Sequence, residues 1–211
     1  MPQTEEQIVR RLLTAIDEDA GVSQRSLSRE IGIAVGSINW YLKRSVRKGL
    51  VKLQQAPVRR YLYYLTPKGF EEKARLTAAF LQSSLDLYRA GRMECAQFFR
   101  DCVSNGNRSI YLAGDGDFAE IAVSSSFETG LKPTAVVDGN AKRRDCVGVP
   151  VFASFKLAVA SHQSSPPNAI LLTDLNDPKA AYHVAADEAA TLGLSREVIH
   201  VPRILNFRPQ P

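Results

Sequence analysis

The sequence has little of what membrane, secreted and metal-binding proteins require. Its longest purely apolar runs are four or five residues, such as 169–172, whereas a transmembrane helix needs about 20. The N-terminus carries acids where a secretory signal carries lysines, and no apolar segment follows them. Its three cysteines, Cys95, Cys102 and Cys146, are an odd number without a C-x-x-C pair, so we expect neither a disulfide framework nor a zinc site. These absences predict a cytoplasmic protein with no membrane partner.

The patterns of several common catalytic sites are missing as well. The sequence has neither a G-x-S-x-G motif nor a P-loop. The Tyr-x-x-x-Lys pair of short-chain dehydrogenases is also missing, because the residue four positions after Tyr182 is Ala186 and not lysine. None of the three histidines, His162, His183 and His200, has a Cys or His at metal-ligand spacing. We therefore expect no enzyme activity, no catalytic residue and no metal ligand.

What the sequence does have is an ordinary globular composition with an uneven charge. Its 211 residues are 45% apolar and 23% charged, which suits one large domain or two small ones. Residues 1–75 hold 14 Lys/Arg and 8 Asp/Glu, whereas residues 76–211 hold 13 and 14. Between residues 23 and 68 there are ten basic side chains and one acid, Glu30. This distribution indicates a polyanionic partner for the first part of the chain only.

The first 66 residues have the pattern of three helices followed by two strands. Residues 4–7 fit a capping box, and the helix that they begin should end near residues 18–19. Ser23 is a suitable N-cap for a second, short helix, and Gly32 is the turn after it. A third helix is expected over 35–48. The residues expected on its buried face are Val35, Ile38, Leu42 and Val46.

Two β-like segments, 50–53 and 60–65, come next, and residues 55–59 between them must turn. A hairpin directly after a helix-turn-helix is a wing. The order of elements therefore predicts a winged helix-turn-helix domain over residues 1–66, with double-stranded DNA as its partner.

The side chains expected to contact DNA lie at the start of the second helix, on the third helix and at the wing. On the third helix they lie near its start or opposite Ile38, on the side that would face the major groove and its flanking phosphates. Free N–H groups at the start of the second helix can bind a phosphate. For Trp40 we favour packing under the wing over stacking on the sugar-phosphate backbone. The candidate residues are Ser23, Gln24, Arg25, Ser37, Asn39, Trp40, Lys43, Arg44, Arg47, Arg59 and Arg60.

Two segments carry a resemblance to a known family. They are SQRSLSREIGIAVGSINWYLKRSVRKGLVKL and YLTPKGFEEKARLT, and over about residues 4–90 the chain resembles winged-helix regulators of the MarR type associated with exopolysaccharide gene clusters. The resemblance implies a sequence-specific transcription regulator. Regulators of that type end soon after the helix that begins here at Pro67, whereas this chain continues for more than 100 residues.

Residues 67–107 are expected to form two linker helices, 67–88 and 93–103, separated at Gly91. Cys95 and Cys102 share one face of the second helix, and we favour two buried small apolar residues there over a redox pair. Helices at this position in winged-helix regulators commonly dimerise. A homodimer is therefore expected, and its two-fold symmetry would match a palindromic operator.

From residue 108 onward, strand patterns alternate with helix patterns. Strands are expected at 109–113, 134–138, 149–152, 169–173 and 198–201, with helices at 118–128, 155–161 and 178–192. Strands separated by helices imply a parallel sheet with right-handed crossovers. The overall fold class is therefore α/β, with a small doubly wound, Rossmann-like domain over 108–211.

The first of these strands runs into a G-x-G-x-x-A turn that begins at Gly114, and Asp138 ends the second strand. This is the pattern of a nucleotide-binding fingerprint, in which the acid accepts ribose hydroxyls. Three acids at the helix start argue against nucleotide binding, because their negative charge weakens the attraction of a helix N-terminus for phosphate. These acids are Asp115, Asp117 and Glu120. A tight turn without a ligand stays open. The basic residues 142–144 are either contacts for a ligand phosphate or a solvated loop. The candidate ligand-binding residues are Gly114, Asp115, Gly116, Asp117, Phe118, Asp138 and Arg143.

The C-terminal segments also carry a resemblance. Four of them resemble the small Rossmann-like domain that precedes the catalytic part of nucleoside-diphosphate-sugar dehydratases and sugar acyltransferases. These segments are IYLAGDGDFAEIAVSSSF, PTAVVDGNAKRRDCVGVPVF, NAILLTD and VIHVPRIL. This resemblance implies a nucleotide or nucleotide-sugar effector, whose identity is unknown. The main hypothesis is a DNA-binding regulator of polysaccharide genes that senses such an effector. The alternatives are an NAD(H)-sensing redox regulator and a nucleotide-sugar enzyme with an accessory winged helix.

Overall fold

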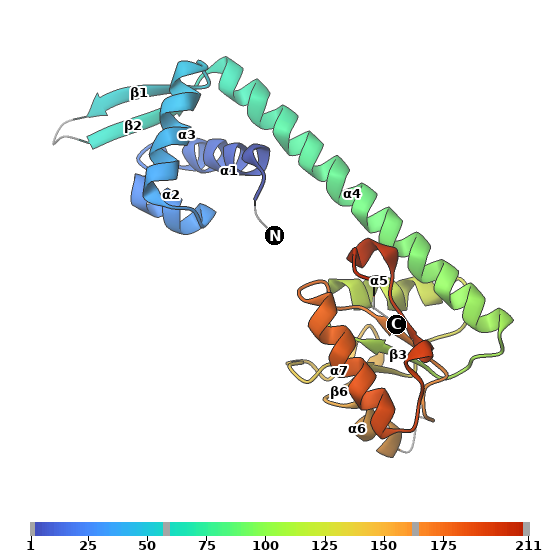
Figure 1. Ribbon diagram of the computed structural model, residues 1–211. Coiled ribbons are helices and arrows are strands. Elements are labelled where there is room, and N and C mark those ends of the chain that lie inside the picture. The colour runs from blue at the N-terminus through green and yellow to red at the C-terminus, as the bar shows by residue number, and fades with distance from the viewer. Residues whose placement is uncertain (1–2, 57–59, 162–164, 209–211) are drawn as a thin grey trace. The chain divides into compact units, whose positions relative to one another are not determined.

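The computed structural model describes residues 3–56, 60–161 and 165–208 (Figure 1). The chain divides into two compact units, Met1–Leu85 and Asp86–Pro211. The division falls within helix α4 (Pro67–Ser104), whose residues are shared between the units. Within the described ranges, no helix combines the length and the apolar content needed to cross a bilayer.

Unit 1 contains three helices and a two-stranded antiparallel sheet before α4, as predicted. Both expected helix caps are present. The Thr4 hydroxyl accepts a hydrogen bond from the Gln7 amide at 3.3 Å, and the Ser23 hydroxyl accepts one from the Ser26 amide at 3.0 Å. Gly32 ends the second helix with a φ of 79°, a backbone conformation that favours glycine. The elements are α1 (Glu5–Glu18), α2 (Gln24–Ile31), α3 (Val35–Arg47), β1 (Val51–Ala56) and β2 (Arg60–Leu65).

The buried face of α3 differs from the prediction at two positions. Ile38 and Leu42 are buried in the core of unit 1, but Val35 and Val46 are exposed and Ser45 is buried instead. At about 100° per residue, Ser45 points within about 20° of Ile38, whereas Val46 points about 80° away from it. Val46 is therefore free to face the hairpin.

The hairpin pairs its strands in a register that places Leu53 opposite Tyr63 and Gln55 opposite Tyr61. Because side chains alternate along a strand, Leu53, Tyr61 and Tyr63 share one face of the hairpin and Tyr64 lies on the other. The turn at 57–59, which includes the predicted contact residue Arg59, lies outside the described residues.

The expected break between two linker helices is wrong, because α4 continues through Gly91. Gly91 is a packing position. A Cβ atom there would lie 2.8 Å from Phe118 Cε2 and 3.4 Å from Ile204 Cδ1. Glycine inside a helix costs about 1 kcal/mol relative to alanine. Here it allows α4 to lie close against Phe118, a contact that the local sequence does not reveal.

The cysteines on α4 are buried, as favoured from the sequence. Cys95 and Cys102 are free thiols in the core of unit 2, and burial raises their pKa values to about 12 and about 11. Both thiols are therefore protonated near neutral pH, which makes them poor nucleophiles.

Unit 2 is an α/β unit built on a six-stranded sheet with the order β5-β6-β4-β3-β7-β8. All neighbouring strands are parallel except β5 and β6, so the sheet is mixed. The five predicted strands are confirmed, and the short antiparallel β5 was missed. The strands are β3 (Ile110–Ala113), β4 (Ala135–Val137), β5 (Asp145–Cys146), β6 (Val149–Phe152), β7 (Ala169–Leu172) and β8 (Ile199–His200). The helices are α5 (Asp117–Ser126), α6 (Phe155–Ala160) and α7 (Pro178–Thr191), with short 3-10 turns at η1 (Arg196–Val198) and η2 (Arg203–Leu205).

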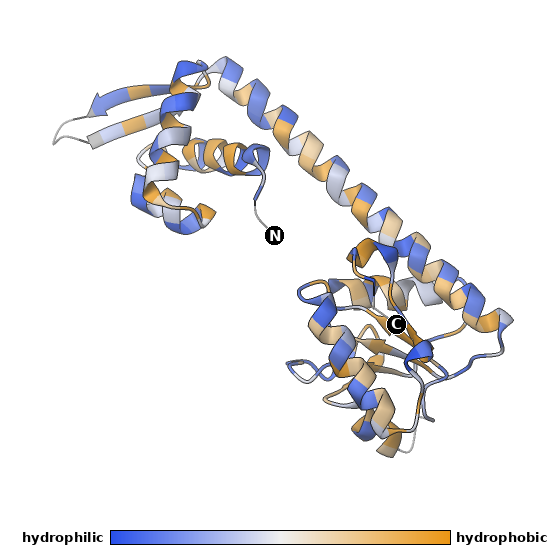
Figure 2. Cartoon of the chain, viewed as in Figure 1, coloured by the Kyte–Doolittle hydropathy of each residue, from blue (hydrophilic) through white to orange (hydrophobic). Residues whose placement is uncertain are grey.

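The central strands β3, β4 and β7 are buried along their whole length, and Figure 2 shows apolar residues gathered on the sheet. Continuous apolar runs are typical of parallel strands that are covered on both faces. The chain passes from β3 to β4 and β6 on one side, and then crosses to β7 on the other side of β3. Such a reversal leaves a crevice at the carboxyl ends of the strands, where ligands of open α/β sheets bind.

Candidate nucleic-acid interface and small-molecule site

In unit 1, a groove of about 640 Å³ lies between α3 and the β1–β2 hairpin. Five of the residues predicted to contact DNA line it: Gln24, Asn39, Trp40, Lys43 and Arg47. Lys43 and Arg47 are exposed one turn apart on α3, and the described residues that line the groove include no carboxylate. The groove therefore has the charge that a nucleic-acid phosphate requires.

The hairpin contributes side chains that the sequence analysis missed. Leu53, Tyr61 and Tyr63 line the groove opposite α3, and Tyr61 is 52% exposed. Tyr63 is buried, and its hydroxyl accepts a long hydrogen bond of 3.4 Å from Gln24 Nε2. The alternation of Tyr61 and Tyr63 along one strand is a signal that places both on one face. It does not reveal that this face is turned toward α3.

Trp40 is open to a partner. It is 48% exposed, it lines the groove, and its ring meets Tyr41 edge-on with the ring centroids 4.8 Å apart. Trp40 is thus held in position while about half of its surface stays in contact with solvent.

Arg44 does not line the groove. Its guanidinium group forms an ion pair of 2.8 Å with Glu5 of α1, and its Cζ atom lies 5.0 Å from the centroid of the Trp40 ring. Because an acid already neutralises it, Arg44 is a weaker candidate for phosphate binding than Lys43 or Arg47. Its partner, Glu5, lies 39 positions earlier in the chain.

Three further predicted contact residues do not line the groove. Ser23, Arg25 and Ser37 are exposed, and the Ser23 hydroxyl is already occupied by the Ser26 amide. Arg60 begins β2, and its side chain, like Arg59, lies outside the described part of the structure.

In unit 2, a cavity of about 310 Å³ lies at the carboxyl ends of β3, β4 and β7, beside α7. Phe155, which is buried, and Val184 of α7, which is exposed, both line it. The described residues that line it include no Lys or Arg. Four carboxylates line it: Asp138, Asp174, Asp177 and Glu188. An anionic group is therefore disfavoured inside this cavity, whereas hydroxyl and amino groups find acceptors.

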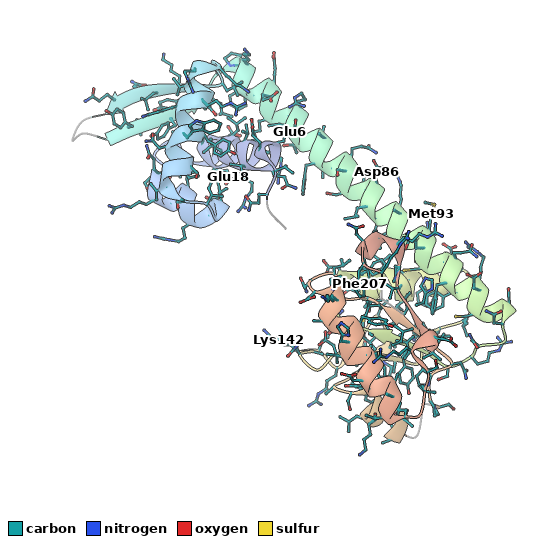
Figure 3. All side chains as sticks on the ribbon, viewed as in Figure 1. Glu6, Glu18, Asp86, Met93, Lys142 and Phe207 are labelled. Atoms are coloured by element: carbon teal, nitrogen blue, oxygen red, sulfur yellow. The ribbon has the colours of Figure 1, made fainter. Side chains whose placement is uncertain are left out.

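A second hollow of about 480 Å³ lies beside the start of α5. Asp138 and Asn140 line both hollows, so the two adjoin. Lys142 lines the second hollow and extends away from the sheet (Figure 3).

Arg143, predicted to bind a ligand phosphate, is engaged by two acids. Its guanidinium group donates to Asp115 at 2.6 Å and to Glu120 at 2.5 Å, and both contacts raise its pKa. The Asp115 side chain is only 4% exposed beneath it. The start of α5 therefore carries its own anions, whose charge offsets the helix dipole that would attract a phosphate.

The turn after β3 is tied to β4 by Asp138. One Asp138 oxygen accepts from the Asp115 amide at 3.0 Å, and the other accepts from the Asn140 amide at 2.8 Å. Gly114 has a φ of 115°, whereas Gly116 has an ordinary φ of −117° and open space where a Cβ would lie. Of the two glycines in the predicted fingerprint, only Gly114 thus has a backbone conformation that favours glycine.

Asp117 begins α5 and lines the second hollow, as the predicted fingerprint would place it. Phe118 does not line either hollow, because its ring is buried against Gly91 of α4. The Phe118 ring is therefore part of the core of unit 2.

Comparison with known proteins assigns a family to part of unit 1 only. Residues 5–52 match a family model described as winged helix-turn-helix DNA-binding. This range ends in β1 and includes all three helices that precede the hairpin. No curated protein matches the chain in sequence.

Among solved structures, the PcaV transcriptional regulator from Streptomyces coelicolor is 26% identical over 36% of this chain and 57% of its own, with a TM-score of 0.33. The same regulator in complex with its natural ligand is 26% identical over 38% and 62%, with a TM-score of 0.30. A mutant of MepR from S. aureus is 19% identical over 40% and 64%, with a TM-score of 0.35. The chain thus spans less than two thirds of each of these structures. What the comparisons establish is a winged helix-turn-helix DNA-binding domain in unit 1.

Proposed function

We propose that this protein is a transcription regulator of the MarR type that binds double-stranded DNA through unit 1 and a small molecule through unit 2. The observation that carries the DNA-binding part is the groove between α3 and the hairpin. It gathers two exposed cations, Lys43 and Arg47, with two polar side chains, Asn39 and Gln24, on the surface that a winged helix presents to DNA.

Replacing Arg47 with alanine is expected to weaken binding to every duplex alike, because a phosphate contact carries no sequence information. The slope of log K against log salt concentration should become shallower by about 1, since each neutralised phosphate contributes about 0.9 to it. The measurement is duplex affinity over a series of salt concentrations.

Arg44→Ala is the matched control for this experiment. Both arginines lie on α3, but Arg44 is paired with Glu5, so its removal should leave the salt slope unchanged. If the intact protein shows no salt dependence, the proposal of DNA binding is wrong. If the two variants lower the slope equally, the distinction drawn here between Arg44 and Arg47 is wrong.

For unit 2 we propose a nucleotide-type effector that occupies the cavity at the strand ends. Its sugar hydroxyls would donate to the carboxylates of the 310 Å³ cavity, and its phosphates would extend past Asn140 toward Lys142. The hollow that Lys142 lines lies beside the start of α5, where Asp115 and Glu120 already hold Arg143, so the proposed phosphate contact is with Lys142 and not with the N-terminal amides of α5. The strand order supports a doubly wound, Rossmann-like unit, and the resemblance to exopolysaccharide regulators suggests polysaccharide genes as targets.

Filling the cavity should abolish the response to the effector. Val184 is 59% exposed on the cavity wall, and Val184→Phe would place a ring in its opening. UDP-sugars, free nucleotides and NADH are tested separately for a rise in melting temperature, since a ligand that binds only the folded state stabilises it. We expect one of these classes to raise the melting temperature of the natural protein and to have no effect on Val184→Phe.

Leu157→Phe provides the matched control, because Leu157 is 55% exposed on α6 and does not line the cavity. An equal response of natural protein and Val184→Phe would place the site elsewhere. A response to NADH alone would favour the redox-regulator alternative, and turnover of a sugar nucleotide would favour the enzyme alternative. If no compound changes the melting temperature, unit 2 would instead be an oligomerisation or partner-docking module. Native mass spectrometry would test the expected homodimer directly.

A further inference from the structure

Unit 1 has a further hollow, between α1 and α4, that shares no lining residue with the groove between α3 and the hairpin. From α4 this α1–α4 hollow takes Leu76, Phe80 and Ser83, whose spacing of about one turn places them on one face of the helix. Its volume is about 250 Å³, below the roughly 300–1,000 Å³ of sites for drug-sized ligands. A molecule that fits it is therefore small.

Arg10 of α1 brings a positive charge to the α1–α4 hollow. Its Cζ atom lies 4.1 Å from the centroid of the Phe80 ring, and this contact holds the guanidinium group in place. No carboxylate among the described residues forms an ion pair with Arg10, and its Nε atom is buried without a hydrogen-bond partner. A buried donor without an acceptor is unfavourable, so this guanidinium group favours an added anion.

The other polar groups of the hollow favour a carboxylate that also carries a hydroxyl group. A planar carboxylate matches the donor geometry of an arginine. Glu6 lines the hollow as well, and its charge repels a dianionic phosphate more than a monoanion. Thr4 and Ser83 contribute hydroxyl groups, and Gln7 contributes a side-chain amide. These groups can exchange hydrogen bonds with a hydroxyl group of the ligand.

We propose that the α1–α4 hollow binds a small hydroxycarboxylate. The carboxylate accepts from the guanidinium group of Arg10, which Phe80 holds in position, and the hydroxyl group of the ligand bonds to Thr4 or Ser83. This site is separate from the cavity of unit 2, and it rests neither on DNA binding nor on the nucleotide-type effector. Because the bound acid joins α1 to α4 within unit 1, it stabilises the folded form of that unit.

Urea unfolding of the whole chain tests the site, because fluorescence of the single tryptophan, Trp40, reports unit 1. Sodium L-lactate, propionate, benzoate and phosphate are each compared with sodium chloride at equal ionic strength. At ten times its Kd, lactate should raise the ratio of folded to unfolded unit 1 about tenfold. Propionate lacks the hydroxyl group and should bind about fivefold more weakly, the size of one neutral hydrogen bond.

Two variants assign the effect to the hollow. Arg10→Gln should lower the affinity for lactate about tenfold or more, the size of a hydrogen bond to a charged group. Phe80→Leu should also lower it, because the guanidinium group loses the ring that positions it. Unfolding without any added acid shows that each variant is folded.

Arg29→Gln and Phe70→Leu are the matched controls. Arg29 is an exposed arginine of α2, Phe70 is 51% exposed on α4, and neither lines the hollow. Both controls should respond to lactate like the natural protein.

Several results would overturn the proposal. If lactate shifts the unfolding midpoint no more than sodium chloride does, the hollow binds no hydroxycarboxylate. If it shifts the natural protein and Arg10→Gln equally, the acid binds elsewhere. A stronger effect of phosphate or benzoate, or an equal effect of propionate, also overturns the proposal, because the ligand would then belong to a different chemical class. None of these outcomes bears on the proposed DNA binding, which the salt series tests separately.

Discussion

Replacing Gly114 with alanine is expected to destabilise unit 2 by about 3 kcal/mol or more, the range of severe single substitutions. Gly114 follows β3 directly and has a φ of 115°, a conformation that costs an L-residue about 1–3 kcal/mol. The added Cβ would also lie 2.7 Å from the backbone nitrogen of Asp174, which follows β7. That neighbour is backbone, so the ends of two central strands would have to move apart to relieve the overlap.

Thermal unfolding followed by circular dichroism measures this effect, and Gly116→Ala is its matched control. Gly116 lies two residues further along the same turn, with a φ of −117° and open space at its Cβ position. Gly116 is the N-cap of α5, where alanine is less favourable than glycine, so this substitution should cost no more than about 1 kcal/mol. Similar melting temperatures for both variants would contradict the role assigned to Gly114. Since the only tryptophan, Trp40, belongs to unit 1, its fluorescence reports that unit separately.

In unit 1, the glycine with a comparably crowded Cβ position is Gly69. Alanine there is also expected to lower the free energy of unfolding by about 3 kcal/mol or more. Gly69 lies in the first turn of α4, and an added Cβ would overlap the carbonyl oxygen of Leu50 and lie 3.0 Å from its carbonyl carbon. Thr66 fixes this approach, because its hydroxyl accepts from the Gly69 amide at 3.0 Å and donates to the Gly49 carbonyl at 2.6 Å. The start of α4 therefore cannot move without breaking the connection that follows α3.

Urea unfolding followed by Trp40 fluorescence measures the effect of Gly69→Ala, with Gly36→Ala as the control. Gly36 lies in α3 with open space at its Cβ position. Alanine there should be neutral or stabilising by up to about 1 kcal/mol, because it restricts the unfolded chain and favours the helix. Duplex affinity of Gly69→Ala should fall in proportion to its folded fraction. An unfolding midpoint close to that of the natural protein would show that the overlap is relieved at little cost.

Several features of both units follow from the sequence because their causes are local. The capping groups Thr4 and Ser23 act on amides three residues away, and Gly32 supplies a turn within its own segment. Strands β3 and β7 are covered on both faces, and such strands have short continuous apolar runs. The two runs could therefore be recognised as strands in the sequence. The gathering of Lys43 and Arg47 follows from their spacing of one helical turn.

Tertiary structure decided the features whose partners come from distant parts of the chain. Gly91 continues a helix because Phe118 and Ile204 occupy the space of its missing side chain. Arg44 and Arg143 have the chemistry of phosphate ligands, but Glu5 pairs with the first, and Asp115 and Glu120 pair with the second. The Tyr61 face meets α3 only through the packing of the hairpin. Local periodicity and capping depend on neighbours within a few residues, whereas charge compensation and close packing depend on which distant residues the fold brings together.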